Sequence, residues 1–469
     1  MTDSPSALPL KRVAVLDIGK TNAKLVVLDA ATGEELAVRR TRNVTRQDGP
    51  YPHYDTDALW AFACGALAEF ARDPGFDAIS ITAHGAAAAL LAKDGTLALP
   101  VLDYEYEYPD PVRAAYRSLR PGFEESFSPA QSMGLNLGAQ LHYQSRGFPD
   151  DFARVATILT YPQYWAYRLT GVAANEVTSL GCHTDLWCPR EARYSTLVDR
   201  LGIRDRLAPL RSAFDVLGPV EPVLAARLGL TEAVRVHCGI HDSNASLLPH
   251  LMTRSGAFSV VSTGTWVVGF AIGGDLDHLD PDRDTLANVD AFARPVPSAR
   301  FMGGREYETL AAEIGPAEPE AIAAALPAVL ARSIMLLPNF VEGSGPFPGR
   351  RGRWINEKGA SPAERHAAVA LYLALMTEAS LSLLGRSGPI IVEGPFAANV
   401  LYLRALAALT GAEIIAAAGS TGTSAGAALL TGIAPPPATG QRVEAAGLSL
   451  AAYRQNWYAA MAPAPADAS

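Results

Sequence analysis

The chain has 469 residues, which is too long for one ordinary hydrophobic core and predicts two large domains. Hydrophobic residues make up 49% and charged residues 19%, so packed interiors are expected and general disorder is not. The formal net charge is -9 with both signs interspersed, which argues against nucleic acid or an anionic membrane as partner and favours a neutral substrate.

The cysteines and the N-terminal segment bear on the compartment. Cys64, Cys182, Cys188 and Cys238 show neither a disulfide framework nor a CxxC pair, which predicts a reducing compartment. Cys182, His183 and Cys188 lack the fourth ligand and the spacing of a zinc site. The segment MTDSPSALPLKR has no long apolar stretch, and no apolar run reaches the roughly 18 residues of a membrane helix. We therefore expect a cytoplasmic protein.

The first half begins with a strand, a turn and a second strand. Residues 13–19, VAVLDIG, are a compact apolar run, a turn follows at Lys20-Thr21-Asn22, and residues 23–29, AKLVVLD, return as a strand. Further elements are expected at 36–42 (strand), 56–72 (helix) and 77–82 (strand). Three short antiparallel strands followed by alternating helix and strand predict an α/β domain.

A similar unit recurs near the middle of the chain. The strand FSVVS at 258–262 runs into a turn at Gly264 that repeats the turn at Gly19, so we expect a duplication with domains at 1–250 and 251–469. Helices are then expected at 317–332, 361–386, 399–411 and 423–432, and strands at 389–393 and 412–417. Three successive prolines indicate a late loop at 434–442, and the terminal APAPADAS is expected to fray.

The first candidate site is the turn from Asp17 to Asn22, with Lys24 shortly after it. A carboxylate at the end of a strand, followed by glycine and hydroxyl or amide side chains, can hold a metal ion and present backbone N–H groups to phosphate. An ordinary hairpin is the alternative and, for this turn alone, the favoured one. A Walker A motif is excluded because its first glycine would fall at Ala14 inside a strand, and no helix follows.

The second candidate site is the equivalent turn, Ser262-Thr263-Gly264-Thr265-Trp266. Its hydroxyls and amides suit the other side of the same phosphate chain, which would place a nucleotide between two homologous domains. A short STG turn is unspecific by itself, but the same turn found twice is stronger evidence.

Three further segments carry candidate residues. Asp242 in CGIHDSNA begins a helix at the domain boundary, where it suits a base that takes a hydroxyl proton; the alternative is a helix N-cap. In the segment from Glu393 to Asn399, a Gly-Pro turn permits a flat ring to approach, and Asn399 suits a helix cap or a ribose contact, of which the cap is favoured. His84, considered without the other motifs, is interpreted as a buried core histidine.

The motifs together resemble the FGGY carbohydrate kinases. DIGKTNAKLVVLD, GIHDSNA, STGTW, MGGREYETLA, EGPFAAN and GSTGTSAGAALL follow one another in this order between residues 12 and 432. The resemblance implies an α/β fold with two ribonuclease H-like domains of the actin-like ATPase type, ATP in a central interdomain cleft, and the sugar held mainly by the first domain. It also implies that Asp242 is the catalytic base and that Asp17 and Asp242 lie at the Mg²⁺ ion.

The resemblance assigns residues to two groups. On the nucleotide side it implies Asp17, Gly19, Lys20, Thr21, Asn22, Lys24, Gly264, Thr265, Gly303, Gly304, Gly394, Phe396 and Asn399. On the sugar side it implies His84, Gly85, Asp103, Gln163 and Asp242. Two sugar-side segments depart from the family pattern: at 101–108, VLDYEYEY replaces tryptophan, aspartate and arginine, and Gln163 in the segment 160–170 stands where an acidic residue is common.

The DIGKTN hairpin looks closest to the fuculokinase and rhamnulokinase side of the family. This implies transfer of the ATP γ-phosphoryl group to a hydroxyl of a 6-deoxy-ketohexose such as L-fuculose or L-rhamnulose. The alternatives are a kinase for a pentulose or polyol, such as xylulose or ribulose, and an actin- or Hsp70-type ATPase, which needs no aspartate aimed at a sugar. A non-catalytic sugar-binding regulator would lack Asp17 or Asp242. Homodimers are common among the relatives, although no segment here requires one.

Overall fold

The chain divides into two compact units. The computed structural model describes residues 10–417, 422–437, 440–445 and 447–462. The first unit comprises Met1–Arg254, Ala287–Pro295 and Thr421–Ala438, and the second comprises Ser255–Leu286, Val296–Ser420 and Thr439–Ser469. The expected division at 250/251 lies near Arg254, but the sequence pattern did not indicate that two later segments belong to the first unit.

A seven-stranded mixed sheet forms the centre of the first unit. Its strand order is β12-β13-β6-β1-β2-β3, and β14 also pairs with β6. The strands are β1 (Arg12–Ile18), β2 (Asn22–Asp29), β3 (Glu35–Arg42), β6 (Ala78–Ala83), β12 (Val216–Pro219), β13 (Arg235–His237) and β14 (Ile240–His241). β1 runs antiparallel to β2 and parallel to β6, and its apolar residues are buried, as expected for a central strand covered on both faces.

The second seven-stranded sheet, most of it in the second unit, repeats this order. Its strands run β17-β18-β16-β15-β21-β22-β23. They are β15 (Phe258–Thr263), β16 (Val267–Ile272), β17 (Thr285–Val289), β18 (Pro295–Phe301), β21 (Ile390–Glu393), β22 (Ile414–Ala416) and β23 (Gln441–Val443). β15 corresponds to β1, because it runs antiparallel to β16 and parallel to β21. β23 begins inside the expected loop at 434–442, while residues 418–421 and most of the terminal APAPADAS lie outside the described residues.

Helices and small sheets complete both units. The first unit contains α1 (Thr56–Arg72), α2 (Asp110–Leu119), α3 (Phe123–Ser126), α4 (Leu137–Gly147), α5 (Pro149–Ala153), α6 (Tyr161–Thr170), α7 (Val177–Leu180), α8 (Thr196–Arg200), α9 (Pro222–Leu228), α10 (Asp242–Thr253) and α15 (Thr423–Ala428). The second contains α11 (Gly303–Ile314), α12 (Pro319–Arg332), α13 (Pro362–Ser382), α14 (Val400–Thr410) and α16 (Ala451–Met461). Short strands form the small sheets β4 (Thr45–Arg46) with β5 (His53–Tyr54), β7 (Ala88–Ala92) with β8 (Leu97–Leu99) and β9 (Val155–Thr160), β10 (Trp187–Cys188) with β11 (Arg193–Tyr194), and β19 (Met335–Leu337) with β20 (Arg353–Ile355). Within the described ranges, no helix combines the length and the apolar character needed to cross a membrane.

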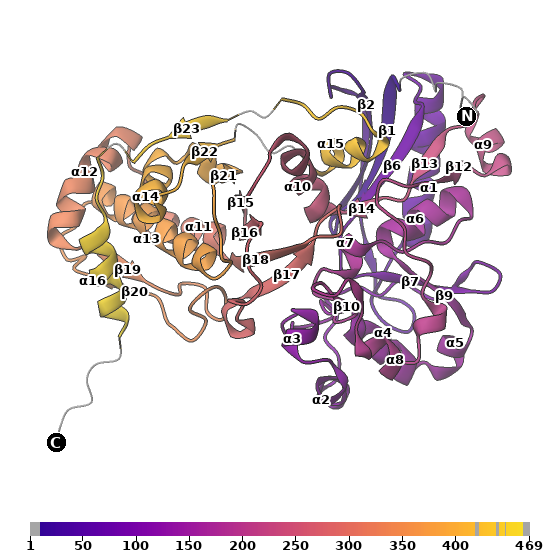
Figure 1. Cartoon of the computed structure of the whole chain (residues 1–469), viewed down its shortest axis with the longest axis horizontal. Coiled ribbons are helices and arrows are strands. Elements are labelled where there is room, and N and C mark those ends of the chain that lie inside the picture. Colours follow the sequence, from indigo (N-terminus) through magenta and orange to yellow (C-terminus); the bar gives the residue numbers. More distant parts are fainter. Residues whose placement is uncertain (1–9, 418–421, 438–439, 446, 463–469) are drawn as a thin grey trace. The chain divides into compact units, whose positions relative to one another are not determined.

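The helix α15 joins a late segment of the chain to the first sheet. Figure 1 shows this yellow helix beside β1 and β6. A β-carbon on Gly426 would lie 1.8 Å from the carbonyl oxygen of Ala245 in α10, so only glycine permits this close helix packing. The packing brings the start of α15 to the end of β1, where the first candidate site lies.

Candidate active site

Asp17 lies near the end of β1, immediately before the hairpin. It is paired across the sheet with Lys24 on β2 and with Thr82 on β6. The hydroxyls of Thr423 and Ser424 at the start of α15 both donate hydrogen bonds to its Oδ2, the latter at 2.8 Å. Burial raises the pKa of Asp17, and the two hydroxyls and the Lys24 ammonium act against this rise. The carboxylate is therefore held in one position at the strand end.

The turn after Asp17 is a tight hairpin, as the sequence predicted. The Gly19 N–H donates to the carbonyl oxygen of Asn22 at 2.9 Å. Asn43 secures the turn from outside, because its side chain donates to the carbonyl oxygen of Gly19 and its backbone N–H donates to that of Thr21, both at 2.9 Å. Thr21 and Asn22 are exposed on this turn, where their polar groups are accessible to a ligand.

Asp242 is the first residue of α10. The N-cap position belongs to His241, so the capping interpretation of Asp242 is wrong. Its Oδ1 lies 3.1 Å from Nε2 of His241 and accepts a hydrogen bond from the N–H of Ser243 at 2.6 Å. Burial acts to raise its pKa, but the hydrogen bond and charge of His241 outweigh burial and lower the pKa of Asp242. Asp242 also interacts electrostatically with Asp17 and His84, so the structure brings these three predicted residues together.

His241 is enclosed on several sides. Its backbone N–H donates to Oγ1 of Thr178 at 3.1 Å, and its imidazole hydrogen-bonds the side chain of Cys182. Burial opposes ionisation, but the charges of Cys182 and Asp242 prevail and raise the pKa of His241. A β-carbon on Gly85 would lie 2.7 Å from Nε2 of His241, so glycine at this position makes room for the imidazole.

His84 lies among three tyrosine rings. The ring centroids of Tyr54, Tyr104 and Tyr161 are 4.9, 5.5 and 4.9 Å from that of His84. Its Nδ1 lies 2.8 Å from the carbonyl oxygen of Gly85, which requires the proton to be on Nδ1, and burial lowers the pKa of His84 to about 4. Nε2 is thus an acceptor, and it is buried without a hydrogen-bond partner among the described residues. Because such a group costs about 1–3 kcal/mol, it is a candidate contact for a ligand hydroxyl.

Lys20 and Asp103, which the sequence placed in different groups, lie together. The Lys20 ammonium is 2.7 Å from Oδ1 of Asp103, and it lies over the rings of Tyr54 and Tyr104 at 5.1 and 5.3 Å from their centroids. The structure therefore places the ammonium of Lys20 on the side of the predicted sugar residues.

Gln163 packs against the turn that precedes Asp242. It is fully buried, and its Nε2 donates to the carbonyl oxygens of Cys238 and Gly239 at 3.1 and 3.0 Å. Its Oε1 accepts a hydrogen bond from the hydroxyl of Thr160 at 2.5 Å. Because the amide already bonds the turn that precedes Asp242, the geometry supports a structural role in place of the expected sugar contact.

The second hairpin turn resembles the first but is one residue shorter. The Gly264 N–H donates to the carbonyl oxygen of Trp266, two residues on, at 2.9 Å, whereas Gly19 bonds Asn22, three residues on. The backbone N–H of Arg305 in α11 donates to the carbonyl oxygen of Thr265 at 3.2 Å. The start of α11 is thereby fixed against this turn.

Glycines bring the two predicted turns of the second unit and the start of α11 close together. A β-carbon on Gly304 would lie 1.8 Å from the carbonyl oxygen of Gly264, and one on Gly394 would lie 1.9 Å from that of Thr263. Gly394 also has a φ of 78°, a backbone conformation that other residues rarely adopt. Gly303 begins α11 beside them. A larger residue at position 304 or 394 would displace the hairpin turn.

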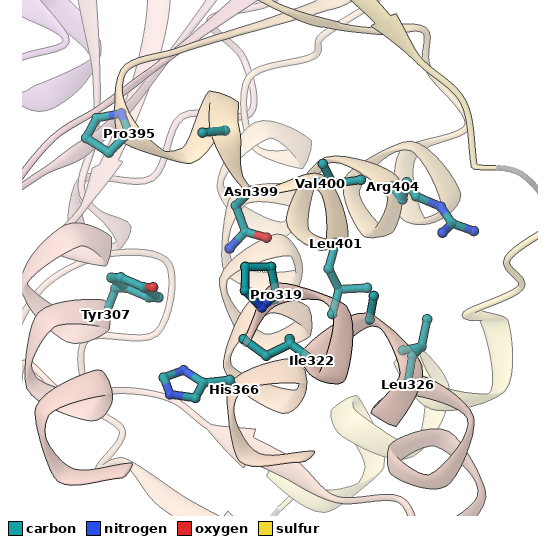
Figure 2. Close-up of a pocket in the computed structure, with 13 residues that line it drawn as sticks. Tyr307, Pro319, Ile322, Leu326, His366, Pro395, Asn399, Val400, Leu401 and Arg404 are labelled. Atoms are coloured by element: carbon teal, nitrogen blue, oxygen red, sulfur yellow. The ribbon is translucent and has the colours of Figure 1, made fainter. Parts of the chain in front are cut away.

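A cavity of about 350 Å³ lies next to these turns in the second unit. Figure 2 shows Asn399 and Pro319 within its lining, with Tyr307 and His366 along one side. Asn399 Oδ1 accepts a hydrogen bond from the N–H of Tyr402 at 3.0 Å, which confirms the expected cap of α14. Phe396 is buried with its ring 5.8 Å from that of Tyr307, so it supports the cavity wall.

The donor set at Asp17 and Asp242 is compatible with Mg²⁺. Within the described residues, no three His, Cys, Asp or Glu side chains gather to hold a metal ion by themselves. Mg²⁺ is commonly bound by one or two carboxylates together with phosphate oxygens and water, so two neighbouring carboxylates suffice. The negative charge of Asp242 contributes to the raised pKa of Asp17, and a cation would relieve this repulsion.

Several residues at the site were not assigned a role from the sequence. Thr423 and Ser424 belong to a motif that was noticed, but their bonds to Asp17 depend on the packing of α15. Tyr54, Tyr104 and Tyr161 form the surroundings of His84. The aromatic runs YEYEY and TYPQYW were the available signal for two of these rings.

Comparisons with known proteins define the class. Residues 13–249 match the N-terminal domain of the FGGY family of carbohydrate kinases, and residues 255–440 match the carbohydrate kinase FGGY C-terminal domain. A carbohydrate kinase from Novosphingobium aromaticivorans is 38% identical with a TM-score of 0.89, over 96% of this chain and 100% of that chain. A xyloylose kinase from Brucella ovis (20% identity, TM-score 0.77, 96% and 98% covered) and a gluconate kinase from Lactobacillus acidophilus (15%, 0.75, 96% and 96%) share the fold. No curated protein matches.

The fold and these matches define a carbohydrate kinase with the two-domain α/β architecture of the actin-like ATPases. The chain belongs to the FGGY family, whose sugar kinases use ATP.

Proposed function

We propose that this kinase transfers the γ-phosphoryl group of ATP to a hydroxyl of a ketose, with Asp242 as the catalytic base. The observation that carries the proposal is the position of Asp242, a carboxylate with a lowered pKa that interacts with both Asp17 and His84. A carboxylate that is ionised at neutral pH can accept the proton that the attacking hydroxyl loses.

The proposed nucleotide residues lie on tight turns. Backbone N–H groups and hydroxyls at Thr21, Asn22 and Thr265 suit phosphate oxygens, because glycine turns expose their donors. The cavity beside Gly394 and Asn399 has the size and apolar lining that suit adenosine. When bound, Mg²⁺ held by Asp17 and Asp242 would neutralise charge on the phosphates.

We further propose a 6-deoxy-ketohexose, such as L-fuculose or L-rhamnulose, as the acceptor. Of the three tyrosines around His84, Tyr104 is partly exposed, and its ring offers apolar surface that suits the methyl group and C–H faces of such a sugar. The Nε2 atom of His84 is an acceptor, so it suits a sugar hydroxyl and does not suit a carbonyl oxygen.

Replacement of the base tests the mechanism. We expect Asp242→Asn to lower kcat by about a hundredfold or more, because the lost group accepts the acceptor proton. The KM for ATP should rise much less, because Asp17 and the turn donors remain to hold Mg²⁺ and the phosphates. The matched control is Asp205→Asn, an exposed carboxylate outside the site, which should keep wild-type kinetics. Turnover of Asp242→Asn near the wild-type value would overturn the assignment.

An acceptor screen tests the substrate. ADP release is measured by a coupled assay with ATP, Mg²⁺ and L-fuculose, L-rhamnulose, D-xylulose, L-ribulose or simple polyols. L-Tagatose and L-fructose are matched controls, because they carry a hydroxymethyl group where the 6-deoxy sugars carry a methyl group. We expect kcat/KM to be about tenfold or more higher for the 6-deoxy member of each pair, as for a burial difference of one small group. Equal values would contradict this substrate class, and ADP release that ignores every acceptor would indicate an ATPase.

A further inference from the structure

The ammonium of Lys20 lies in a polar cluster of three side-chain oxygens. Its Nζ lies 2.7 Å from Oδ1 of Asp103, 3.3 Å from Oε2 of Glu105 and 3.5 Å from Oγ1 of Thr45. The side chains of Lys20 and Asp103 are only 17% and 7% exposed, so this ion pair is more than a surface contact. An ammonium has three donor hydrogens, and these three oxygens match them in number.

Asp103 connects this cluster to the surroundings of His84. It accepts hydrogen bonds from the hydroxyl of Tyr54 at 3.2 Å, from that of Thr45 at 2.9 Å and from the N–H of Glu105 at 3.1 Å. The ring of Tyr54 in turn packs against His84. Loss of the Lys20 charge would therefore leave a largely buried carboxylate unpaired next to the tyrosines.

This geometry argues against Lys20 as a phosphate ligand. Two carboxylates already neutralise its charge, and a phosphate group would have to displace them. The ammonium also lies over the faces of Tyr54 and Tyr104, which hold it on the acceptor side by cation–π attraction.

We propose that Lys20 is a specificity-determining residue of the acceptor site, which fixes Asp103 and the ring of Tyr104 at the sugar and, through Tyr54, the position of His84. Lys20 acts through these neighbours and is a positioning residue. The inference rests on the proposed function, because it concerns the binding of the same sugar acceptor.

Steady-state kinetics of Lys20→Met and Lys20→Arg test the proposal, with the acceptor that gives the highest kcat/KM in the screen. We expect Lys20→Met to raise the KM for the acceptor about tenfold or more and to leave the KM for ATP within about twofold. Lys20→Arg should recover part of the acceptor affinity, because it keeps the charge opposite Asp103. Lys93→Met, at an exposed lysine outside the site, is the control for loss of a positive charge. A raised KM for ATP with an unchanged acceptor KM would overturn the proposal in favour of a phosphate contact.

A double-mutant cycle with Asp103→Asn separates this role from general destabilisation. Because both single changes remove the same ion pair, the acceptor KM of the double variant should be close to that of the worse single variant. Independent effects that multiply would contradict the proposal. Thermal unfolding of every variant identifies any that fail to fold, and Lys20→Arg then carries the test. Absence of acceptor-dependent ADP release in the wild-type enzyme would overturn both the proposed function and this inference, whereas an active wild type with an unaltered Lys20→Met overturns the inference alone.

Discussion

A methyl group added at Gly85 should disable the proposed catalytic base, Asp242, without contacting it. The β-carbon of Gly85→Ala would lie 2.7 Å from Nε2 of His241, which is closer than two such atoms can approach. That same nitrogen lies 3.1 Å from Oδ1 of Asp242. The imidazole is buried and hydrogen-bonded to Cys182, and the backbone N–H of His241 is held by Thr178, so relief of the contact must move either the ring or the backbone at position 85.

The size of the effect follows from these distances. Relief of the 2.7 Å contact to an ordinary separation of about 3.4 Å requires a movement of about 0.7 Å, which would lengthen the 3.1 Å separation of His241 and Asp242 to as much as about 3.8 Å, beyond hydrogen bonding. Loss of a charge-assisted hydrogen bond is worth about 1.5–3 kcal/mol, or roughly 10- to 100-fold in kcat if the base is misplaced. Overpacking alone costs about 1–3 kcal/mol of stability.

Kinetics and thermal unfolding of Gly85→Ala check this reasoning, with Gly65→Ala as the matched control. Gly65 is an exposed position in α1 with no atom within 4 Å of an added β-carbon. The control should keep its activity and gain about 0.5–1 kcal/mol of stability from alanine in a helix. A folded Gly85→Ala enzyme with wild-type kcat would refute the proposed coupling. A raised acceptor KM with unchanged kcat would instead support the direct sugar contact that the family resemblance implied.

The two hairpins could be predicted because their determinants are local. The apolar run before Gly19 and the one before Gly264 are each short, continuous and followed by turn residues, which identifies buried strands and tight turns without knowledge of distant contacts. The repeated turn then indicated the duplication that the strand order of the two sheets displays. The cap of α14 at Asn399 could also be predicted locally, because asparagine is a preferred residue directly before a helix.

The partners of individual side chains could not be predicted, because they lie far apart in sequence. Lys20 follows Asp17 closely, which suggested a phosphate role, yet the ammonium pairs with Asp103 through a contact that only the fold creates. Gln163 was assigned to the sugar by position in a motif, whereas its amide supports the turn before Asp242. Strand patterns fix which face a residue occupies, but they do not fix where a long, flexible side chain ends.

Two further substitutions test the fully buried carboxyl group of Glu176 and the proposed nucleotide turns. Burial raises the pKa of Glu176 to about 7. Between pH 4.5, its ordinary pKa, and pH 7, the folded protein keeps a proton that the unfolded chain has released, so the stability of the fold should fall as the pH rises through this range. Glu176→Gln removes this titration. The difference in unfolding free energy between the variant and wild type should therefore grow in favour of the variant by roughly 3 kcal/mol between pH 4.5 and pH 8. A difference that does not change with pH would contradict this. Gly304→Ala would place a β-carbon 1.8 Å from the carbonyl oxygen of Gly264, so the turn must move, and the KM for ATP should rise about tenfold or more. The acceptor KM should stay unchanged, because the proposed sugar contacts belong to the other unit, and Gly349→Ala, with no atom within 4 Å of its added carbon, should match wild type. An unaltered KM for ATP in a folded Gly304→Ala enzyme would show that this turn does not hold the nucleotide.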